Sequence, residues 1–193
     1  MKYPLYRVLR PIIKVLMKLV FRVQYVNKKN IPKKGPYILV GNHKSNFDCV
    51  MVISSVKETV HFLAKKELID GKLGFFFKWM GIIPVDRKKR NKEAMNAARE
   101  VLENKGVVGI FPEGTFNKTE YITMPFKMGA VKMAKEADVK IVPFAITGNY
   151  RLFRKSIKLT FGKAYKLKDK DDLVKENITL MNKVIRLLKN GNN

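Results

Sequence analysis

The sequence has a single cysteine, Cys49, and only two histidines, His43 and His61, among its 193 residues. A lone cysteine excludes an intramolecular disulfide framework. With so few cysteine and histidine side chains, a structural zinc site is excluded as well. We therefore expect no metal and no other resident cofactor.

Acidic residues are also scarce: 16 Asp and Glu stand against 40 Lys and Arg, which gives a formal net charge of +24. Such a charge attracts nucleic acid, an anionic membrane surface, or acidic substrates such as phosphates and coenzyme A. Charge alone does not choose among these partners. A disordered chain is excluded, because 46% of the residues are apolar, enough for one domain with a short appendage.

A long apolar run is missing from the first 22 residues, although they are rich in Leu, Ile and Val. Cations recur there at Arg7, Arg10, Lys14, Lys18 and Arg22. A membrane span needs about 20 mostly apolar residues, and a secretory signal has a charge-free core followed by a small-residue cleavage site. The segment fits neither pattern, so we predict a protein that stays in the cytoplasm.

The spacing of these five cations predicts an amphipathic helix. Steps of three and four residues place them on one stripe, and the rest of the circumference is apolar. We interpret residues 1–22 as a membrane-interface helix whose cations face phosphate headgroups, and residues 23–193 as the remaining domain. The alternative is a helix packed on that domain with a solvated basic edge, but the wide apolar arc favours the membrane. Pro11 marks either a kink or a late start.

Short apolar runs alternate with helical patterns beyond residue 22. The predicted strands cover residues 23–26, 37–40, 60–64, 82–85, 107–111, 141–146 and 156–161, and the predicted helices cover residues 47–56, 66–80, 91–104, 126–137 and 169–189. This alternation predicts an α/β fold with a single mostly parallel or mixed sheet flanked by helices. Ligands of such sheets bind at the carboxyl ends of the strands, so the residues that follow each apolar run are candidates for chemistry.

His43 and Asp48 follow the predicted strand 37–40, where the chain turns into a helix. From the first helical turn, Asp48 can reach one imidazole nitrogen and leave the other as a proton acceptor. We interpret the pair as a general base with its orienting carboxylate, the alternative being a capping or core histidine. Cys49 lies on another side of the helix, and we interpret it as a packing residue.

Two further clusters follow predicted strands. Phe111-Pro112-Glu113-Gly114-Thr115 follows the strand that begins at Val107, and its glycine permits close approach of a ligand to the backbone, although the same residues also suit a plain turn. Arg87 follows the strand 82–85, where its guanidinium suits a phosphate. Residues 73–80 are rich in aromatics and form either core or an apolar surface for acyl chains or lipid.

These blocks resemble the glycerolipid acyltransferase family that includes bacterial 1-acylglycerol-3-phosphate acyltransferases. The family's hallmarks are Asn-His-x4-Asp, Gly-x5-Arg, Phe-Pro-Glu-Gly-Thr and an apolar block with a proline. All four occur here in order, at residues 42–48, 81–87, 111–115 and 139–144. The resemblance covers residues 20–165, which makes residues 23–193 the predicted acyltransferase domain.

The resemblance implies an enzyme that moves a fatty acyl group from acyl-CoA or acyl carrier protein to the sn-2 hydroxyl of 1-acylglycerol-3-phosphate (lysophosphatidic acid), giving phosphatidic acid in phospholipid biosynthesis. His43, held by Asp48, would be the base, and backbone amides near His43 and Gly114 would stabilise the oxyanion. The residues implied in substrate binding are Asn42, Lys65, Arg87, Glu113, Gly114, Thr115 and Lys127. We expect a peripheral, monotopic protein on the cytoplasmic face of the membrane, with anionic lipids as partners and without nucleic acid.

One departure from the family concerns the acceptor. Phe116 stands where the family usually has an arginine that contacts the acceptor phosphate, although Lys65, Lys118 and Lys127 offer other cations. An acyltransferase with a different lysolipid acceptor is therefore one alternative, and a basic nucleic-acid-binding module is the other. The acyl chain length and the choice of acyl donor stay open.

Overall fold

A computed structural model of the protein describes residues 3–86 and 92–191. Within these ranges seven strands form one sheet in the order β1-β7-β6-β2-β5-β3-β4. All neighbouring pairs are parallel except β6 and β7, which are antiparallel. The predicted α/β fold with one mixed sheet is thus confirmed. The strands are β1 (Gln24–Val26), β2 (Tyr37–Gly41), β3 (Val60–Lys65), β4 (Ile83–Val85), β5 (Val107–Ile110), β6 (Lys140–Gly148) and β7 (Ile157–Phe161).

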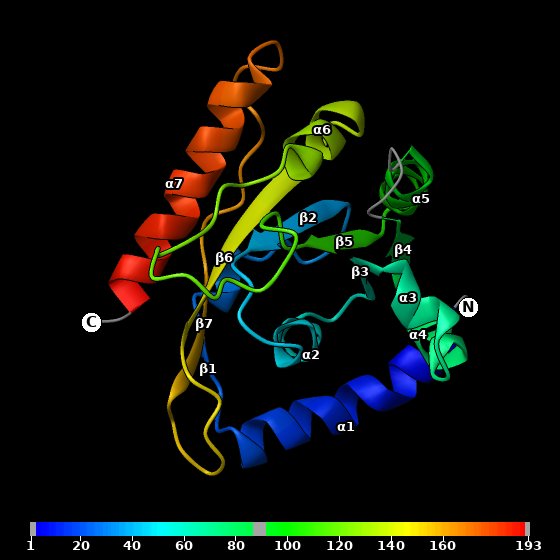
Figure 1. Ribbon diagram of the computed structural model, residues 1–193, viewed down its shortest axis with the longest axis vertical. Coiled ribbons are helices and arrows are strands. Elements are labelled where there is room, and N and C mark those ends of the chain that lie inside the picture. Colours follow the sequence, from blue (N-terminus) through cyan, green and yellow to red (C-terminus); the bar gives the residue numbers. More distant parts are fainter. Residues whose placement is uncertain (1–2, 87–91, 192–193) are drawn as a thin grey trace.

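Helices cover both faces of this sheet (Figure 1). One face is covered by α1 (Pro4–Val20) and α2 (Phe47–Ser55), and the other by α5 (Lys92–Glu103), α6 (Gly129–Glu136) and α7 (Leu173–Gly191). The short helices α3 (Lys66–Asp70) and α4 (Gly74–Trp79) follow β3, and a 3-10 turn, η1 (Lys28–Asn30), follows β1. Successive side chains of β2 point to opposite faces of the sheet. Tyr37 and Leu39 pack in the core under α1 and α2. Ile38 and Val40 pack in the core under α5, α6 and α7. This burial on both faces explains the continuous apolar runs of the central strands.

The predicted helix 66–80 is wrong in one respect, because the structure divides it into α3 and α4. Gly71 follows α3, and Gly74 is the first residue of α4. A Cβ atom at Gly74 would lie 1.7 Å from the carbonyl oxygen of Ile69, so only glycine allows the chain to turn back this closely. Of the aromatic segment that follows, Leu73, Phe75 and Trp79 are exposed whereas Met80 is buried, so it forms both surface and core.

Three other predicted bounds also move for local reasons. α7 begins at Leu173 and not at residue 169, because the Asp169 carboxylate accepts the amides of Asp171 and Asp172 in a turn and Asp172 accepts that of Lys175 as a helix cap. α6 begins at Gly129, after the turn residue Met128. β6 continues to Gly148, where it pairs with Ile157 of β7.

Helix α1 packs on the domain along one side and exposes apolar side chains along another. Tyr6 and Met17 are buried, and the Tyr6 hydroxyl donates to the Glu58 carbonyl and accepts from the Val60 amide. The helix runs continuously through Pro11, so a late start there is wrong. Arg10 also departs from the predicted stripe of cations that face phosphate headgroups, because its Nε donates to the carbonyl of Val56. In the described residues, no helix has the length and apolarity needed to cross a membrane.

Candidate active site

The carboxyl ends of β2, β5 and β6 bring the candidate residues together. His43 lies in the turn after β2, and Asp48 is in the first turn of α2. The His43 Nδ1 and Asp48 Oδ2 atoms are 2.9 Å apart, which is the contact that their spacing predicts. Asp48 is fully buried, whereas the side chain of His43 is 16% exposed. A carboxylate on Nδ1 leaves Nε2 as the proton acceptor of the imidazole.

The Asp48 carboxylate holds the turn as well as the imidazole. Its Oδ2 also accepts the backbone amides of Lys44 at 2.6 Å and Ser45 at 2.8 Å. Its Oδ1 accepts the Tyr150 hydroxyl at 2.7 Å. Burial raises the pKa of Tyr150 well above its usual range, and the Asp48 charge adds to this effect. The tyrosine is therefore a protonated donor that fixes the far side of the carboxylate.

Tyr150 is a site residue that the sequence reasoning missed. It follows β6, so the rule that points to residues after each strand applies to it as much as to His43. Because the apolar run ends at Ile146, the predicted strand ends too early, and Tyr150 falls outside the segment searched. Its position 102 residues from Asp48 in the sequence leaves no local motif to indicate the contact.

Two phenylalanines enclose the imidazole of His43. The Phe111 ring stacks on it with centroids 3.9 Å apart, and the Phe116 ring meets it edge to face at 4.4 Å. The residue that replaces the family's arginine therefore lies against the imidazole. This aromatic packing limits rotation of the His43 side chain.

Glu113 and Asn42 are buried, and both are already occupied by contacts within the protein. The Glu113 carboxylate accepts the His43 amide at 3.0 Å and the Met124 amide at 2.9 Å. Burial raises the pKa of Glu113, although these two amides oppose the shift. The Asn42 side chain donates to the carbonyl of Ile146 and accepts its amide, which ties the end of β2 to β6. Both side chains hold the backbone of the site, and the substrate contacts expected of them stay predictions.

Four amides of the two turns already have acceptors within the protein, and the oxyanion role expected of amides near these turns stays a prediction. The amides of His43, Lys44 and Ser45 donate to carboxylates. The Gly114 amide donates to the carbonyl of Phe111 at 3.0 Å. Gly114 has a φ of +71°, and a Cβ atom placed on it would lie 2.8 Å from Nζ of Lys127. The ammonium group of Lys127 thus lies directly over this turn.

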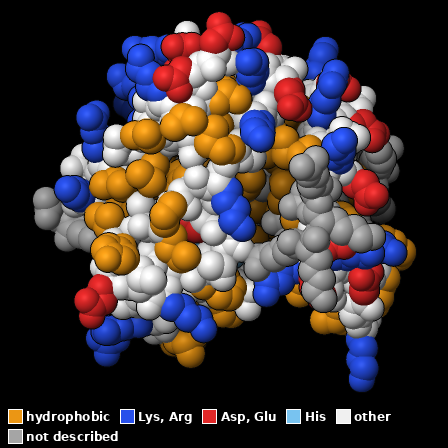
Figure 2. Space-filling model, turned by 45° about the horizontal axis from the view of Figure 1, so that its top comes forward, with side chains coloured by type: hydrophobic (Ala, Val, Ile, Leu, Met, Phe, Trp, Pro, Cys, Tyr) orange, Lys and Arg blue, Asp and Glu red, His pale blue; other side chains and the backbone are white. Residues whose placement is uncertain are grey.

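A cavity of about 390 Å³ adjoins the histidine. Its walls are mostly apolar, and they include Phe111, the ring that stacks on His43. Lys65, Gly114 and Lys127 line it as well, whereas Thr115 is exposed outside it. Arg87, the remaining predicted phosphate contact, lies outside the described residues. Figure 2 shows a face of the molecule on which apolar side chains lie beside lysine and arginine.

In the described residues, neither a reactive thiol at Cys49 nor a cluster of metal-ligand side chains accompanies the His43–Asp48 pair. Burial raises the pKa of the Cys49 thiol to about 12, and the neighbouring Asp48 charge adds to this effect, so the side chain stays a neutral thiol. Among residues 3–86 and 92–191, no three His, Cys, Asp or Glu side chains gather as a metal-ligand set. The chemistry available at this edge is that of a base, its carboxylate and a mostly apolar cavity lined by three lysines, Lys65, Lys127 and Lys132.

Comparisons with known proteins agree with this geometry. Residues 22–147 match the sequence model of the family described as Acyltransferase. A Bacillus subtilis 1-acyl-sn-glycerol-3-phosphate acyltransferase is 31% identical over 78% of this chain and 77% of its own length. A yeast protein of the same name is 36% identical over 67% of the chain, which spans only 44% of the yeast protein.

A solved structure shows the same fold. The crystal structure of the 1-acyl-sn-glycerophosphate acyltransferase PlsC from Thermotoga maritima superposes with a TM-score of 0.75 at 24% identity, covering 95% of this chain and 81% of that one. The family match ends at residue 147, so Tyr150 lies beyond it.

Proposed function

Since the chain belongs to the acyltransferase family, we propose that it transfers a fatty acyl group to the sn-2 hydroxyl of 1-acylglycerol-3-phosphate, producing phosphatidic acid. The observation that carries the proposal is the His43–Asp48 pair beside a cavity with apolar walls and three lysines. The apolar walls suit an acyl chain, and the lysines suit a phosphate. The relatives whose printed names state this activity support the choice of acceptor.

In the proposed mechanism Nε2 of His43 takes the proton of the acceptor hydroxyl. The oxygen of that hydroxyl attacks the thioester carbonyl of acyl-CoA or acyl carrier protein. The carbon–sulfur bond breaks, and the thiol leaves with the proton returned by the imidazolium. Asp48 stabilises the charge that the imidazole carries between these steps. We assign Lys127, whose ammonium lies over Gly114, to stabilise the developing oxyanion.

The remaining predicted residues have separate roles in this proposal. Lys65 and the undescribed Arg87 bind the acceptor phosphate, and Thr115 offers a hydroxyl at the entrance. Glu113 and Asn42 keep the two turns in place through their backbone contacts. No acyl-enzyme is formed, since a thiolate is a good leaving group.

Acyl transfer by the purified protein tests the proposal. We expect phosphatidic acid from lysophosphatidic acid and either oleoyl-CoA or oleoyl acyl carrier protein. Lysophosphatidylcholine, lysophosphatidylethanolamine and monoacylglycerol serve as competing acceptors. The position of Phe116 against His43 favours a second candidate, an acyltransferase for another lysolipid. Faster transfer to one of the competing acceptors would replace the first proposal with that one, and no transfer to any acceptor would refute both.

Tyr150 gives a test of the site beyond the family motifs. In Tyr150→Phe the Asp48 Oδ1 loses its donor, so the carboxylate holds the imidazole less firmly. We expect kcat to fall about tenfold, the worth of one charged hydrogen bond of about 1.5 kcal/mol, while KM changes little. The exposed Tyr121→Phe is the matched control. A Tyr150→Phe variant that lowers only thermal stability would show that the hydroxyl has no part in catalysis.

We also propose that α1 attaches the protein to the cytoplasmic leaflet as a peripheral, monotopic enzyme. The observations in support are the apolar side chains that α1 leaves exposed and the absence of any acid before Asp48. Arg7, Lys14 and Lys18 are exposed beside them. The exposed apolar side chains are Val8, Ile12, Val15, Leu16 and Leu19.

The double variant Ile12→Asp, Leu16→Asp tests this attachment, because the two side chains are about half exposed and one helical turn apart. Lost apolar burial and added negative charge should weaken binding to anionic vesicles by about a hundredfold. Val174→Asp, Ile178→Asp on α7 matches it in spacing, exposure and charge. Equal vesicle binding by both variants would exclude α1 as the anchor. An affinity for nucleic acid that falls steeply with salt and is the same in both variants as in the original protein would favour the nucleic-acid-binding alternative.

A further inference from the structure

The loop of residues 149–156, which joins β6 to β7, lies at the end of α1. Its Phe153 amide donates to the carbonyl of Val20, and its Lys155 carbonyl accepts Nε2 of Gln24. In Figure 1 this loop and α1 form the lower edge of the molecule. The loop is therefore fixed to the same edge that carries the exposed apolar side chains of α1.

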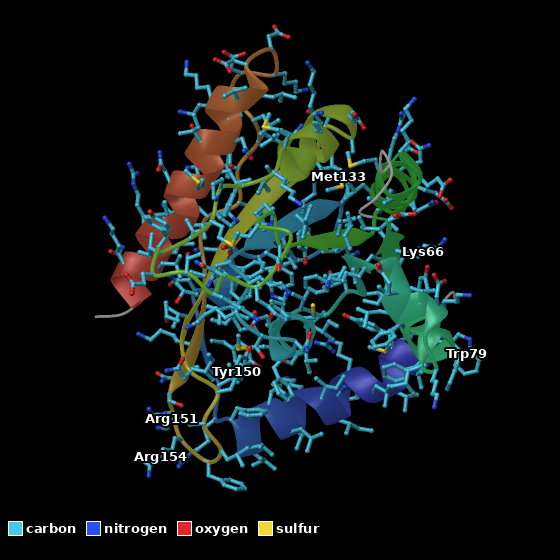
Figure 3. All side chains as sticks on the ribbon, in the orientation of Figure 1. Lys66, Trp79, Met133, Tyr150, Arg151 and Arg154 are labelled. Atoms are coloured by element: carbon cyan, nitrogen blue, oxygen red, sulfur yellow. The ribbon has the colours of Figure 1, made fainter. Side chains whose placement is uncertain are left out.

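The tip of this loop combines exposed apolar and basic side chains. Leu152 and Phe153 are 61% and 68% exposed, and Arg151, Arg154 and Lys155 flank them. Phe153 also has a φ of +57°, a conformation that a bulky residue rarely adopts. Figure 3 shows Arg151 and Arg154 extending outward from the loop, whereas Tyr150 points inward toward α2. A large aromatic held outward in an unfavourable backbone conformation needs a compensating contact.

A basic groove of about 580 Å³ separates the loop from the end of α1. Lys18, Arg22 and Lys155 line it together with Leu19 and Phe153. The sequence has no Asp or Glu before residue 48, and none from residue 139 to 168. Neither of the segments that form the groove therefore supplies an acid to neutralise its cations.

We propose that the 149–156 loop is a second membrane-contact element, which inserts Leu152 and Phe153 into an anionic leaflet while the groove binds phospholipid phosphate groups. The proposal extends, and rests on, the peripheral attachment proposed for α1. Cations placed beside apolar tips fit the boundary between headgroups and acyl chains. A polynucleotide would satisfy the cations but leave the two apolar tips in water.

Direct contact can be measured with a fluorescent probe at the tip. The chain has one tryptophan, Trp79, so Phe153→Trp in a Trp79→Phe background reports on the loop alone. With vesicles of phosphatidylglycerol and phosphatidylcholine we expect a blue shift and quenching by lipids brominated in the acyl chain. Ile178→Trp in the same background is the control on α7. Emission that is unchanged for Phe153→Trp while the protein sediments with the vesicles would overturn the proposal.

Loss of binding gives an independent measurement on the full chain. The double variant Leu152→Asn, Phe153→Asn should lower the affinity for these vesicles, measured by sedimentation, about tenfold. Asparagine is used because it tolerates the positive φ of residue 153. Val174→Asn, Ile178→Asn is the matched control. The double variant Arg151→Gln, Arg154→Gln should weaken vesicle binding more at low salt than at high salt. The control is the double variant Lys175→Gln, Lys189→Gln on α7. Equal binding by loop variants and their controls, at unchanged melting temperatures, would also overturn the proposal.

These measurements use no acyl donor, so their outcome is separate from that of the reaction. A protein that makes phosphatidic acid but keeps its loop out of the bilayer refutes the loop proposal alone. A protein whose loop enters the bilayer but which transfers no acyl group refutes only the proposed reaction.

Discussion

Replacing His43 with alanine should lower kcat for acyl transfer about 10³- to 10⁴-fold, because the reaction then has no base for the acceptor hydroxyl. The fold should survive, since the sheet and the α2 turn do not depend on the imidazole. The measurement is the initial rate of phosphatidic acid formation by purified protein, with circular dichroism and thermal unfolding as checks on the structure.

His43→Asn separates the base from the hydrogen bond that holds it. The asparagine amide can occupy the place of Nδ1 and donate to Asp48, but it has nothing in place of Nε2. If the role of His43 were structural, this variant would retain activity. We expect it to be as inactive as His43→Ala, and retention of most of the activity by either variant would refute the mechanism.

Asp48→Asn should lower kcat about 10²- to 10⁴-fold while the protein remains folded. With its amide oxygen in the place of Oδ2, the asparagine accepts the same donors from His43, Lys44 and Ser45. Its amide group then faces the Tyr150 hydroxyl, which can turn from donor to acceptor. Only the negative charge is lost, so the imidazolium formed during the reaction is no longer stabilised.

The Asp48→Ala variant measures how much the hydrogen bonds of the carboxylate contribute to the stability of the fold. It leaves the part-buried Lys44 and Ser45 amides without their acceptor, at a cost of about 1 kcal/mol for each, the lower end of the range for a lost partner. Thermal unfolding should therefore shift much more for Asp48→Ala than for Asp48→Asn. Full activity of Asp48→Asn would show that the charge is not used, and equal unfolding of the two variants would show that the hydrogen bonds to the Lys44 and Ser45 amides do not stabilise the fold.

The sequence predicted the parts of the site that lie close together in the chain. His43 and Asp48 are five residues apart, so a turn into a helix is enough to bring them into contact, and the contact is present. The sheet follows from apolar runs of strand length separated by helical patterns. These predictions depend only on local geometry and on burial of the sheet by helices.

The parts that the sequence did not predict depend on contacts between distant segments. Tyr150 reaches Asp48 from the loop after β6, 102 residues along the chain, and Glu113 reaches the amide of His43 across 70 residues. Glu113 and Asn42 stand in the predicted motifs, but the motifs do not indicate the backbone groups that these side chains bind. The pattern of a sequence shows that such polar residues matter without showing which atoms they contact.

The way α1 is joined to the domain has a consequence for thermodynamic linkage. Tyr6 is buried and bonded to both Glu58 and Val60, so the helix cannot leave without opening the core. Attachment through α1 would then select the native state over the unfolded chain, as any ligand of the folded protein does. Anionic vesicles should raise the melting temperature of the intact enzyme, and the bilayer would contribute directly to the stability of the active site.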